Sequence, residues 1–361
     1  MTISSAVDIQ MMQRCIELAQ RAAGKTSPNP LVGSVIVKDG KVIGEGFHPG
    51  VGQPHAEIFA LRDAKQAQGA TVYVNLEPCN HYGRTPPCSE ALIEAKVAKV
   101  VTGMVDPDPR VAGGGIEKLR NAGIEVIVGV EELACRRLNE AFIHRITKQQ
   151  PFGILKYAMT LDGKIAATTG HSAWVTGKDA RHLVHQVRST CDAVIIGGNT
   201  VRKDNPNLTT HNLTKHNPRR VVMSRSLDLP TECNLWNTNI APTTIFTENK
   251  NSPLQTQLTA KKVEIITVAT LTPKIVTEHL YQQGISQVLW ECGGTLAAKA
   301  IADGTIQKVM AFIAPKIIGG TSAPSPVGDL GLKLMTDALQ LKDLELKAIA
   351  DDILIEGYLS I

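Results

Sequence analysis

The spacing of apolar residues over the first fifty positions predicts one helix followed by a β-hairpin. Between residues 6 and 23, apolar side chains recur every three or four positions, and a glycine and two prolines then end the run. This spacing is typical of an amphipathic helix and its stop. Two runs rich in β-branched residues follow, at 31–38 and 41–47, and Asp39-Gly40 separates them. Because this dipeptide favours a two-residue turn, the two runs are expected to pair as a hairpin.

From residue 56 to residue 144 the pattern alternates between helical and extended spacing. It predicts helices over 56–67, 89–95, 115–122 and 132–144, and strands over 71–75, 97–105 and 125–130. Repeated β–α units are typical of an α/β domain whose sheet lies between layers of helices. The polar segment 148–151 ends in a proline where this pattern stops. We therefore expect a first domain over residues 1–147.

The second half also alternates between strands and helices. Strands are expected over 152–160, 192–196, 221–224, 243–247, 263–267, 287–292 and 308–315, and helices over 178–189, 273–283 and 296–302. Residues 205–260 are rich in Asn, Thr and Pro, which predicts long irregular loops between short strands. We expect a second α/β domain over residues 151–361.

The composition agrees with two folded domains and argues against several classes of protein. A chain of 361 residues exceeds the size at which one hydrophobic core usually keeps growing. With 43% hydrophobic and 20% charged residues, neither disorder nor collagen-like or coiled-coil structure is expected. A net charge of +4 and an aromatic content of 4% argue against a nucleic-acid partner, whose surface needs basic patches and stacking platforms. A small acidic ligand is compatible with this charge.

The cysteines and the first residues favour a cytoplasmic protein. Seven scattered cysteines make an odd count and a poor disulfide framework. The first residues lack the basic and apolar regions of a secretory signal, and no run approaches the ~18 apolar residues that would span a membrane. We therefore expect most of the cysteines to be small core residues.

One histidine and two cysteines have the pattern of a metal site. His55 opens a predicted helix, Cys79 follows a predicted strand, and Cys88 leads into the next helix, so both thiols are expected near helix N-termini that favour thiolate. Three nitrogen and sulfur ligands leave the fourth position of zinc open for water, as in catalytic sites. Glu57, two residues after His55, is the candidate general acid/base. Core packing or a reactive thiol pair would account for the cysteines taken alone.

The pattern His-x-Glu followed by Pro-Cys and a second Cys resembles that of the zinc nucleobase deaminases. Eight residues stand between Cys79 and Cys88, where the generic signature has two. With this longer string and the segment 27–33, the first half is similar to the deaminase half of the bifunctional riboflavin-biosynthesis deaminase/reductases. The resemblance implies a cytidine-deaminase-like three-layer domain. It also implies substrate contacts from Asn29, His48 and His81, weaker candidates in Asp106 and Asp108, and a phosphate contact from Arg84.

Two glycine pairs in the second half follow apolar strands. They are Gly197-Gly198 and Gly293-Gly294. Such a joint between strand and helix either presents backbone N–H groups to a pyrophosphate or is simply a tight corner. No Gly-x-Gly-x-x-Gly stands between a strand and a helix, so a Rossmann site is not expected.

The segments 155–166, 172–177 and 200–209 are similar to the reductase half of the same family, which has a dihydrofolate-reductase-like fold and uses NADPH. The resemblance implies cofactor contacts from Ala158, Thr176, Thr200, Asp204, Gly293, Gly294, Thr295, Leu296 and Lys299. It implies substrate contacts from Lys156, Ser172, Trp174, Arg188, Leu208, His211 and Glu291. Lys156 and Asp162 are either polar residues of the site or solvated charges at the end of a strand.

One position departs from the pattern of that family. An arginine usually follows the Leu-Thr pair and holds the substrate phosphate with Arg188 and Ser172, whereas this sequence has His211. Either Arg219 or Arg220 replaces that arginine, or His211 binds the phosphate as an imidazolium.

The resemblance implies a two-step enzyme of riboflavin biosynthesis. Zinc-bound hydroxide would attack the amino-bearing ring carbon of a diaminopyrimidinone ribosylamine phosphate, and Glu57 would move the proton that releases ammonia. NADPH would then deliver hydride to C1′ of the ribosyl group of the aminouracil product. The resemblance to the family also implies a homo-oligomer. We expect neither a nucleic-acid partner nor a membrane partner.

Two other interpretations agree less well with the sequence. A nucleic-acid base deaminase would need a basic channel and stacking residues that this composition lacks. A structural zinc module joined to a binding domain would need neither Glu57 nor an open zinc position.

Overall fold

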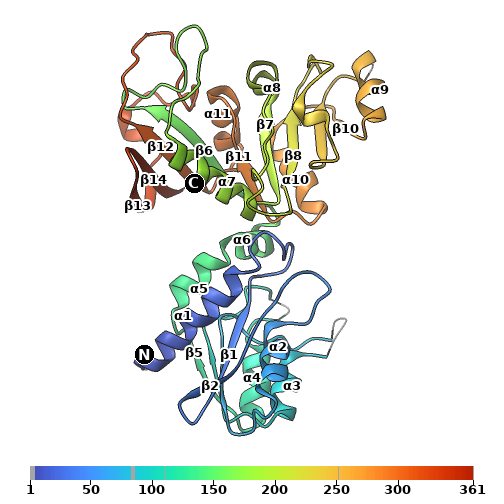
Figure 1. Ribbon diagram of the computed structural model, residues 1–361, viewed down its shortest axis with the longest axis vertical. Helices are drawn as coiled ribbons and strands as arrows, with labels where there is room; N and C mark the ends of the chain where they lie inside the picture. Colours follow the sequence, from blue (N-terminus) through green and yellow to red (C-terminus); the bar gives the residue numbers. More distant parts are fainter. Residues whose placement is uncertain (1–4, 83–85, 110, 251, 361) are drawn as a thin grey trace. The chain divides into compact units, whose positions relative to one another are not determined.

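The structure is a computed structural model that describes residues 5–82, 86–109, 111–250 and 252–360. The chain divides into two compact units, Met1–Gln149 and Gln150–Ile361 (Figure 1). Within the described ranges, every helix is too short or too polar to cross a membrane.

The first unit is built on a five-stranded sheet of order β2-β1-β3-β4-β5. Its strands are β1 (Gly33–Lys38), β2 (Lys41–Phe47), β3 (Thr71–Val74), β4 (Lys99–Thr102) and β5 (Glu125–Val128). Its helices are α1 (Ala6–Gln20), α2 (Ala56–Ala64), α3 (Cys88–Glu94), α4 (Gly114–Asn121), α5 (Glu132–Leu138) and α6 (Glu140–Lys148). Helices α1 and α5 cover one face of the sheet, and α2, α3 and α4 cover the other (Figure 1). The expected three-layer α/β domain is confirmed.

The hairpin forms as the sequence predicts. β1 and β2 pair antiparallel, with Lys38 opposite Lys41. Asp39 and Gly40 adopt φ values of 50° and 73°. Positive φ at both central positions is what the two-residue turn requires, and Asp and Gly tolerate it better than other residues.

Two glycines in β2 place α2 directly on the sheet. A Cβ atom on Gly44 would lie 2.4 Å from the carbonyl oxygen of Ala60, and one on Gly46 would lie 2.4 Å from that of Ala56. Only glycine permits this approach of helix backbone to strand backbone. The approach fixes the N-terminal end of α2, which follows His55.

One predicted helix of the first unit is split. The run 132–144 forms α5 and α6 instead of one helix, with a break at Asn139. The side chain of Asn139 accepts a hydrogen bond from the Leu31 backbone N–H at 2.8 Å and donates to the Leu31 carbonyl at 3.0 Å. This tertiary contact lies at the break between the two helices. The apolar spacing of the run indicates neither the contact nor the break.

The second unit is built on a nine-stranded sheet of order β10-β9-β8-β7-β11-β6-β12-β14-β13. Its strands are β6 (Phe152–Thr160), β7 (Ala193–Gly197), β8 (Arg219–Met223), β9 (Thr243–Thr247), β10 (Glu264–Thr267), β11 (Gln287–Trp290), β12 (Lys308–Ala314), β13 (Leu341–Ile349) and β14 (Asp352–Leu359). Its α-helices are α7 (Lys178–Thr190), α8 (Gly198–Asp204), α9 (Pro253–Ala260), α10 (Pro273–Gln282) and α11 (Gly294–Ala302). In this order, the first seven strands, β10 through β12, pair in parallel with their neighbours. β14 runs antiparallel to β12 and β13.

The sequence pattern does not indicate three elements of this unit. α9 lies in the region expected to be irregular, whereas α8 begins directly after β7, at the expected joint between strand and helix. β13 and β14 were not predicted at all. In β13, charged residues occupy most positions between the apolar ones, and the strand is exposed along much of its length, so its spacing does not have the appearance of a core strand.

Candidate functional site

Three donor atoms meet in the first unit. One ligand atom each from His55, Cys79 and Cys88 lies within 4.8 Å of the others. His55 precedes α2, Cys79 follows β3, and Cys88 is the first residue of α3. The Nδ1 atom of His55 lies 3.5 Å from Cys79 Sγ and 3.3 Å from Cys88 Sγ. The structure therefore brings together the three residues that the sequence pattern indicates.

The surroundings of these atoms fit a zinc ion. One imidazole nitrogen and two sulfurs are a donor set that zinc prefers. The backbone N–H of Cys88, at the start of α3, donates to Cys79 Sγ at 3.3 Å, a contact that favours the thiolate form. The Oε2 atom of Glu57 is buried and has no hydrogen-bond partner among the described residues. An orphaned buried oxygen is costly, so it indicates a missing partner beside the donor atoms.

Glu57 has the properties of a proton carrier. Its side chain is 3% exposed, and burial raises its pKa to about 7. A carboxyl group that titrates near neutral pH both accepts and donates a proton at little cost. Its place in the first turn of α2, two residues after His55, keeps it beside the donor atoms.

Two residues expected to bind substrate lie at the same place. Asn29 Nδ2 donates to His48 Nε2 at 3.1 Å, and His48 Nδ1 lies 3.0 Å from the Pro54 carbonyl oxygen. The rings of His48 and His55 are 5.6 Å apart at 83°. Burial lowers the pKa of His48. Because one nitrogen faces a carbonyl and the other faces an amide N–H, His48 is fixed as a neutral imidazole with a set orientation.

The remaining candidates of the first unit differ in their surroundings. His81 is exposed, and burial raises the pKa of Asp106 to about 6. Asp106 Oδ1 accepts the backbone N–H of Asp108 at 2.8 Å. Arg84 lies outside the described residues.

Glu77, which the sequence pattern does not single out, organises the loops around the site. Its two carboxylate oxygens accept four backbone N–H groups, those of Asp106, Gly113, Gly115 and Ile116, at 2.9–3.2 Å. Glu77 is 3% exposed. It thus joins the chain just before Cys79 to the N-terminal end of α4. Nothing in the string Glu-Pro-Cys distinguishes this role from that of a ligand or a surface charge.

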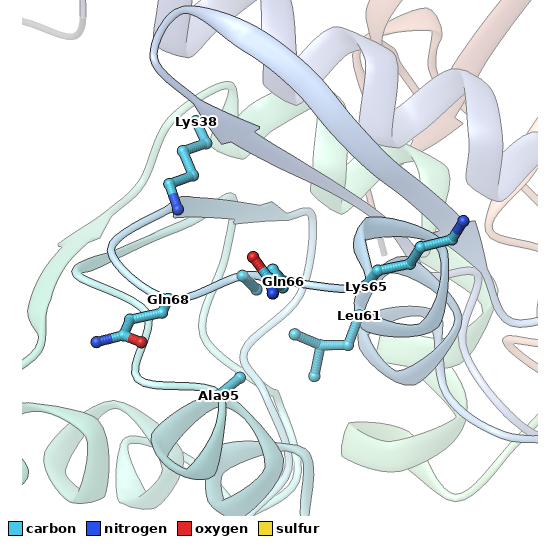
Figure 2. A pocket seen from close by; sticks show the side chains of 7 residues that line it. Lys38, Leu61, Lys65, Gln66, Gln68 and Ala95 are labelled. Atoms are coloured by element: carbon cyan, nitrogen blue, oxygen red, sulfur yellow. The ribbon is translucent and has the colours of Figure 1, made fainter.

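A hollow of about 400 Å³ lies at the opposite end of α2. Lys38, Leu61, Lys65, Gln66, Ala67, Gln68 and Ala95 line it (Figure 2). Because α2 has nine residues, it separates the hollow from His55 by roughly 13 Å. The hollow is not part of the metal site.

In the second unit, three of the expected substrate contacts form one charged group. Arg188 makes two parallel bonds to Glu291, Nε to Oε1 at 2.5 Å and Nη2 to Oε2 at 2.9 Å. Lys156 Nζ lies 3.8 Å from Glu291 Oε2. Burial alone would raise the pKa of Glu291, but the charges of Arg188 and Lys156 lower it to about 2. Glu291 directly follows β11, and Lys156 lies on the adjacent strand β6.

Both glycine pairs are strand-to-helix joints, as predicted. Gly197 ends β7 and α8 begins at Gly198, while Gly293 caps α11, which begins at Gly294. Thr200 and Asp204 lie on α8, Thr295, Leu296 and Lys299 lie on α11, and Ala158 lies on β6 opposite Phe312. A cavity of about 330 Å³ is lined by Lys299 and by Arg225, which follows β8.

The other candidates lie on loops. Ser172 is exposed, and Trp174 is 69% exposed with the guanidinium of Arg181 4.4 Å from its ring centroid. Thr176 is buried, and its carbonyl oxygen accepts from Arg181 Nη1 at 2.7 Å. Leu208 is buried. Asp162 accepts the Gly319 backbone N–H at 2.7 Å, so it holds a loop.

The structure gives Arg219 and Arg220 other partners, which argues against either of them as the replacement for the missing phosphate ligand. Arg219 Nη1 donates to Thr244 Oγ1 at 2.7 Å and to Glu264 Oε2 at 2.8 Å. Arg220 is fully buried, and it donates to the carbonyl oxygens of Asn234, Asn237 and Ala241. The Arg220 guanidinium is thus enclosed by backbone carbonyls, and Arg219 Nη1 is engaged with the neighbouring strands β9 and β10.

Comparison with known proteins agrees with this division. Residues 5–104 match the family described as the cytidine and deoxycytidylate deaminase zinc-binding region, and residues 151–355 match the RibD C-terminal domain. The chain is 63% identical over 350 residues to the riboflavin biosynthesis protein RibD of a Synechocystis species, covering 96% of this chain and 95% of that one.

Two solved structures cover almost the whole chain. Acinetobacter baumannii RibD is 40% identical with a TM-score of 0.87, covering 98% of this chain and 99% of that one. A Thermotoga maritima protein, a diaminohydroxyphosphoribosylaminopyrimidine deaminase/5-amino-6-(5-phosphoribosylamino)uracil reductase, is 37% identical with a TM-score of 0.87 and the same coverage. The chain therefore belongs to the RibD family of riboflavin biosynthesis proteins, in which a zinc-dependent deaminase is joined to a reductase that uses NADPH.

Proposed function

We propose that the unit Met1–Gln149 deaminates a diaminopyrimidinone ribosylamine phosphate and that the unit Gln150–Ile361 then reduces its ribosyl group to ribityl. The substrate and product are those in the description of the Thermotoga relative. The observation that carries the proposal is the buried, unpartnered carboxylate oxygen of Glu57 beside the His55, Cys79 and Cys88 donor atoms.

In the deaminase, this chain's residues hold the metal, orient the ring and move protons. A bound zinc ion would supply an acidified water near neutral pH. Glu57 is assigned the transfer of that proton to the amine that leaves as ammonia, since burial holds its pKa near 7. Asn29 and His48 are assigned to the pyrimidine, because their hydrogen bond places them beside His55. His81 is assigned to the same substrate.

In the reductase, the charged group around Glu291 is assigned to the substrate. NADPH, when bound, supplies the hydride that goes to C1′. Lys156, Arg188 and Glu291 present a largely buried array of fixed charges for the polar substrate. Ser172, Trp174, Leu208 and His211 are assigned to the same substrate. The cofactor is assigned to the glycine joints before α8 and α11, with Ala158, Thr176, Thr200, Asp204, Thr295, Leu296 and Lys299. Backbone N–H groups at such joints suit a pyrophosphate.

One assay tests both assignments. The purified protein is given the diaminopyrimidinone phosphate with and without NADPH, while ammonia and NADPH absorbance are followed. We expect ammonia in both cases and NADPH oxidation only after ammonia has appeared. NADPH oxidation without the deaminated intermediate would contradict the proposed order of the two steps.

We further propose that the enzyme is a homo-oligomer that works in the cytoplasm. All seven cysteines are unpaired, including the buried ones, which suits a reducing compartment. Apolar side chains are exposed on and near the edge strand β13, with Met335 at 89%, Leu346 at 67% and Leu334 at 64%, and such a patch favours association. Light scattering should give a mass above one chain, and Leu346→Lys should lower it.

A further inference from the structure

Two histidines stack beside the charged group of the second unit. His185 lies on α7 one turn before Arg188, and His211 lies in the segment after Leu208. Their ring centroids are 3.9 Å apart with an angle of 28° between the planes. Arg188 Nη1 lies 3.3 Å from His185 Nδ1 and donates to the Thr209 carbonyl at 3.1 Å. Since a guanidinium is only a donor, this His185 nitrogen is the acceptor and carries no proton.

The groups facing this stack set its charge. Arg188 and Glu291 act on His185 directly, and His182 acts on it from α7. Lys156 adds a second positive charge 3.8 Å from Glu291, so Arg188, Lys156 and Glu291 together carry one net positive charge. Burial, His211 and Arg188 lower the pKa of His185 to about 4. Burial and Arg188 also lower the pKa of His211. At neutral pH both imidazoles are therefore uncharged while no anion is bound.

A phosphate monoester changes this balance. It carries two negative charges above its second pKa of about 6, one more than the net positive charge of Arg188, Lys156 and Glu291. An anion beside an imidazole favours the imidazolium form. A second imidazolium would be opposed by the first, because the rings are stacked at 3.9 Å. One proton is thus the expected uptake for the pair.

We propose that the substrate phosphate binds against the His185–His211 stack and that this pair takes up one proton from solvent as it binds. The inference rests on the proposed reductase function and adds to it a phosphate contact, His185, and a dependence on pH. An arginine at position 211 would carry its charge at every pH of interest and would need no proton.

The sign of the pH dependence follows from the linkage between protonation and binding. Where the imidazole is neutral in the free enzyme and protonated in the complex, affinity falls as pH rises, by up to tenfold per pH unit for one proton. The fall stops above the pKa that the imidazole has in the complex. A substrate without phosphate should show no such fall.

The test measures the reductase KM for the deaminated substrate from pH 6.5 to 8.5 at saturating NADPH. For the unaltered enzyme we expect KM to rise by about threefold to tenfold per pH unit before it levels off. For His211→Arg we expect a KM that is flat over this range, and for His185→Asn a shallower rise. The dephosphorylated substrate is the control, with a higher and pH-independent KM.

Each outcome has a separate meaning. A flat KM in the unaltered enzyme with normal turnover, or the same slope in His211→Arg, would overturn the proton uptake and leave the reductase assignment standing. Failure to oxidise NADPH at any pH would instead overturn the proposed function. His211 is exposed, so its replacement is not expected to prevent folding.

Discussion

The two units differ in how much of their sites exists before anything binds. In the first unit three donor atoms lie within 4.8 Å of one another, and Glu57 and His48 beside them are at most 3% exposed. In the second unit the residues assigned to NADPH are spread over β6, the loop before α7, α8 and α11, and Asp204, Gly293, Thr295 and Lys299 are exposed. One site is a buried cluster, whereas much of the other is an open surface.

This difference follows from the chemistry of each step. Metal-assisted proton transfer needs a few groups at fixed distances in a water-excluding place. Hydride transfer uses chemistry carried by the cofactor, so the protein supplies mainly a binding surface. We therefore expect substitutions in the first site to abolish turnover, and substitutions on the open part of the second to raise KM.

The largest effect should come from Glu57→Gln. The amide has nearly the same shape but carries no proton to the leaving amine, so deaminase turnover should fall by roughly 10²–10⁴-fold. Ammonia release measures this loss. Zinc content, measured on the same sample, should be unchanged, as should NADPH oxidation with the deaminated substrate.

Cys88→Ser is the matched variant for that result. It should lose both zinc and ammonia release while the reductase persists. A Glu57→Gln protein that keeps both its zinc and its deaminase activity would support a structural rather than a catalytic metal.

The next effect concerns the buried charged group of the second unit. Arg188→Ala leaves Glu291 with Lys156, 3.8 Å away, as its remaining cationic partner. Breaking a buried ion pair from one side costs about 3–5 kcal/mol, so the unfolding free energy of this unit should fall by an amount of that order. Reductase turnover should fall with it, and denaturant unfolding measures the stability.

A double variant separates the two losses. Arg188→Met combined with Glu291→Gln removes this ion pair but leaves Lys156 without its acidic partner, so it should recover only part of the unfolding free energy. It should not recover reductase activity. Recovery of activity would show that the pair is only a structural contact.

A smaller effect should follow from moving α2. Gly44→Ala places a Cβ atom 2.4 Å from the Ala60 carbonyl oxygen, and overpacking of this kind costs about 1–3 kcal/mol. Deaminase activity should fall because α2 carries Glu57, while the reductase should be unaffected. Val42→Ala on the exposed part of the same strand is the control and should change neither activity.

The sequence predicted the site of the first unit better than that of the second, for physical reasons. Glu57 and the metal ligands can be recognised in the sequence because few residue types bind zinc or transfer protons at that spacing. Glu77 gives no such signal, since its role depends on four backbone N–H groups that only the fold assembles. In the same way, the spacing around Asn139 cannot show that its side chain binds Leu31.

In the second unit, the local spacing of residues predicts the buried strands but not the exposed ones. β6 and β9 have the predicted bounds because they are buried runs rich in apolar or β-branched residues inside a parallel sheet. β13 was missed because it is an exposed edge strand with charges between its apolar residues. Arg220 was weighed as a phosphate ligand because an arginine in the sequence looks the same whether it is exposed or, as here, bound to backbone carbonyls in the core.

The smallest effect on stability should come from Trp174→Ala. The ring is 69% exposed, and the Arg181 guanidinium 4.4 Å from its centroid is its one cation–π partner among the described residues. An exposed contact of that kind contributes about 0.5–1 kcal/mol, so the unfolding free energy should change by no more than this. An exposed indole that packs little is free to contact a ligand, so KM of the reductase should rise while kcat changes less. Trp174→Phe keeps an aromatic face and should restore most of the KM. If Trp174→Ala instead lowers the unfolding free energy strongly and leaves KM unchanged, this part of the second unit is packed as tightly as the site of the first unit. The difference between a buried first site and an open second site would then not hold at Trp174.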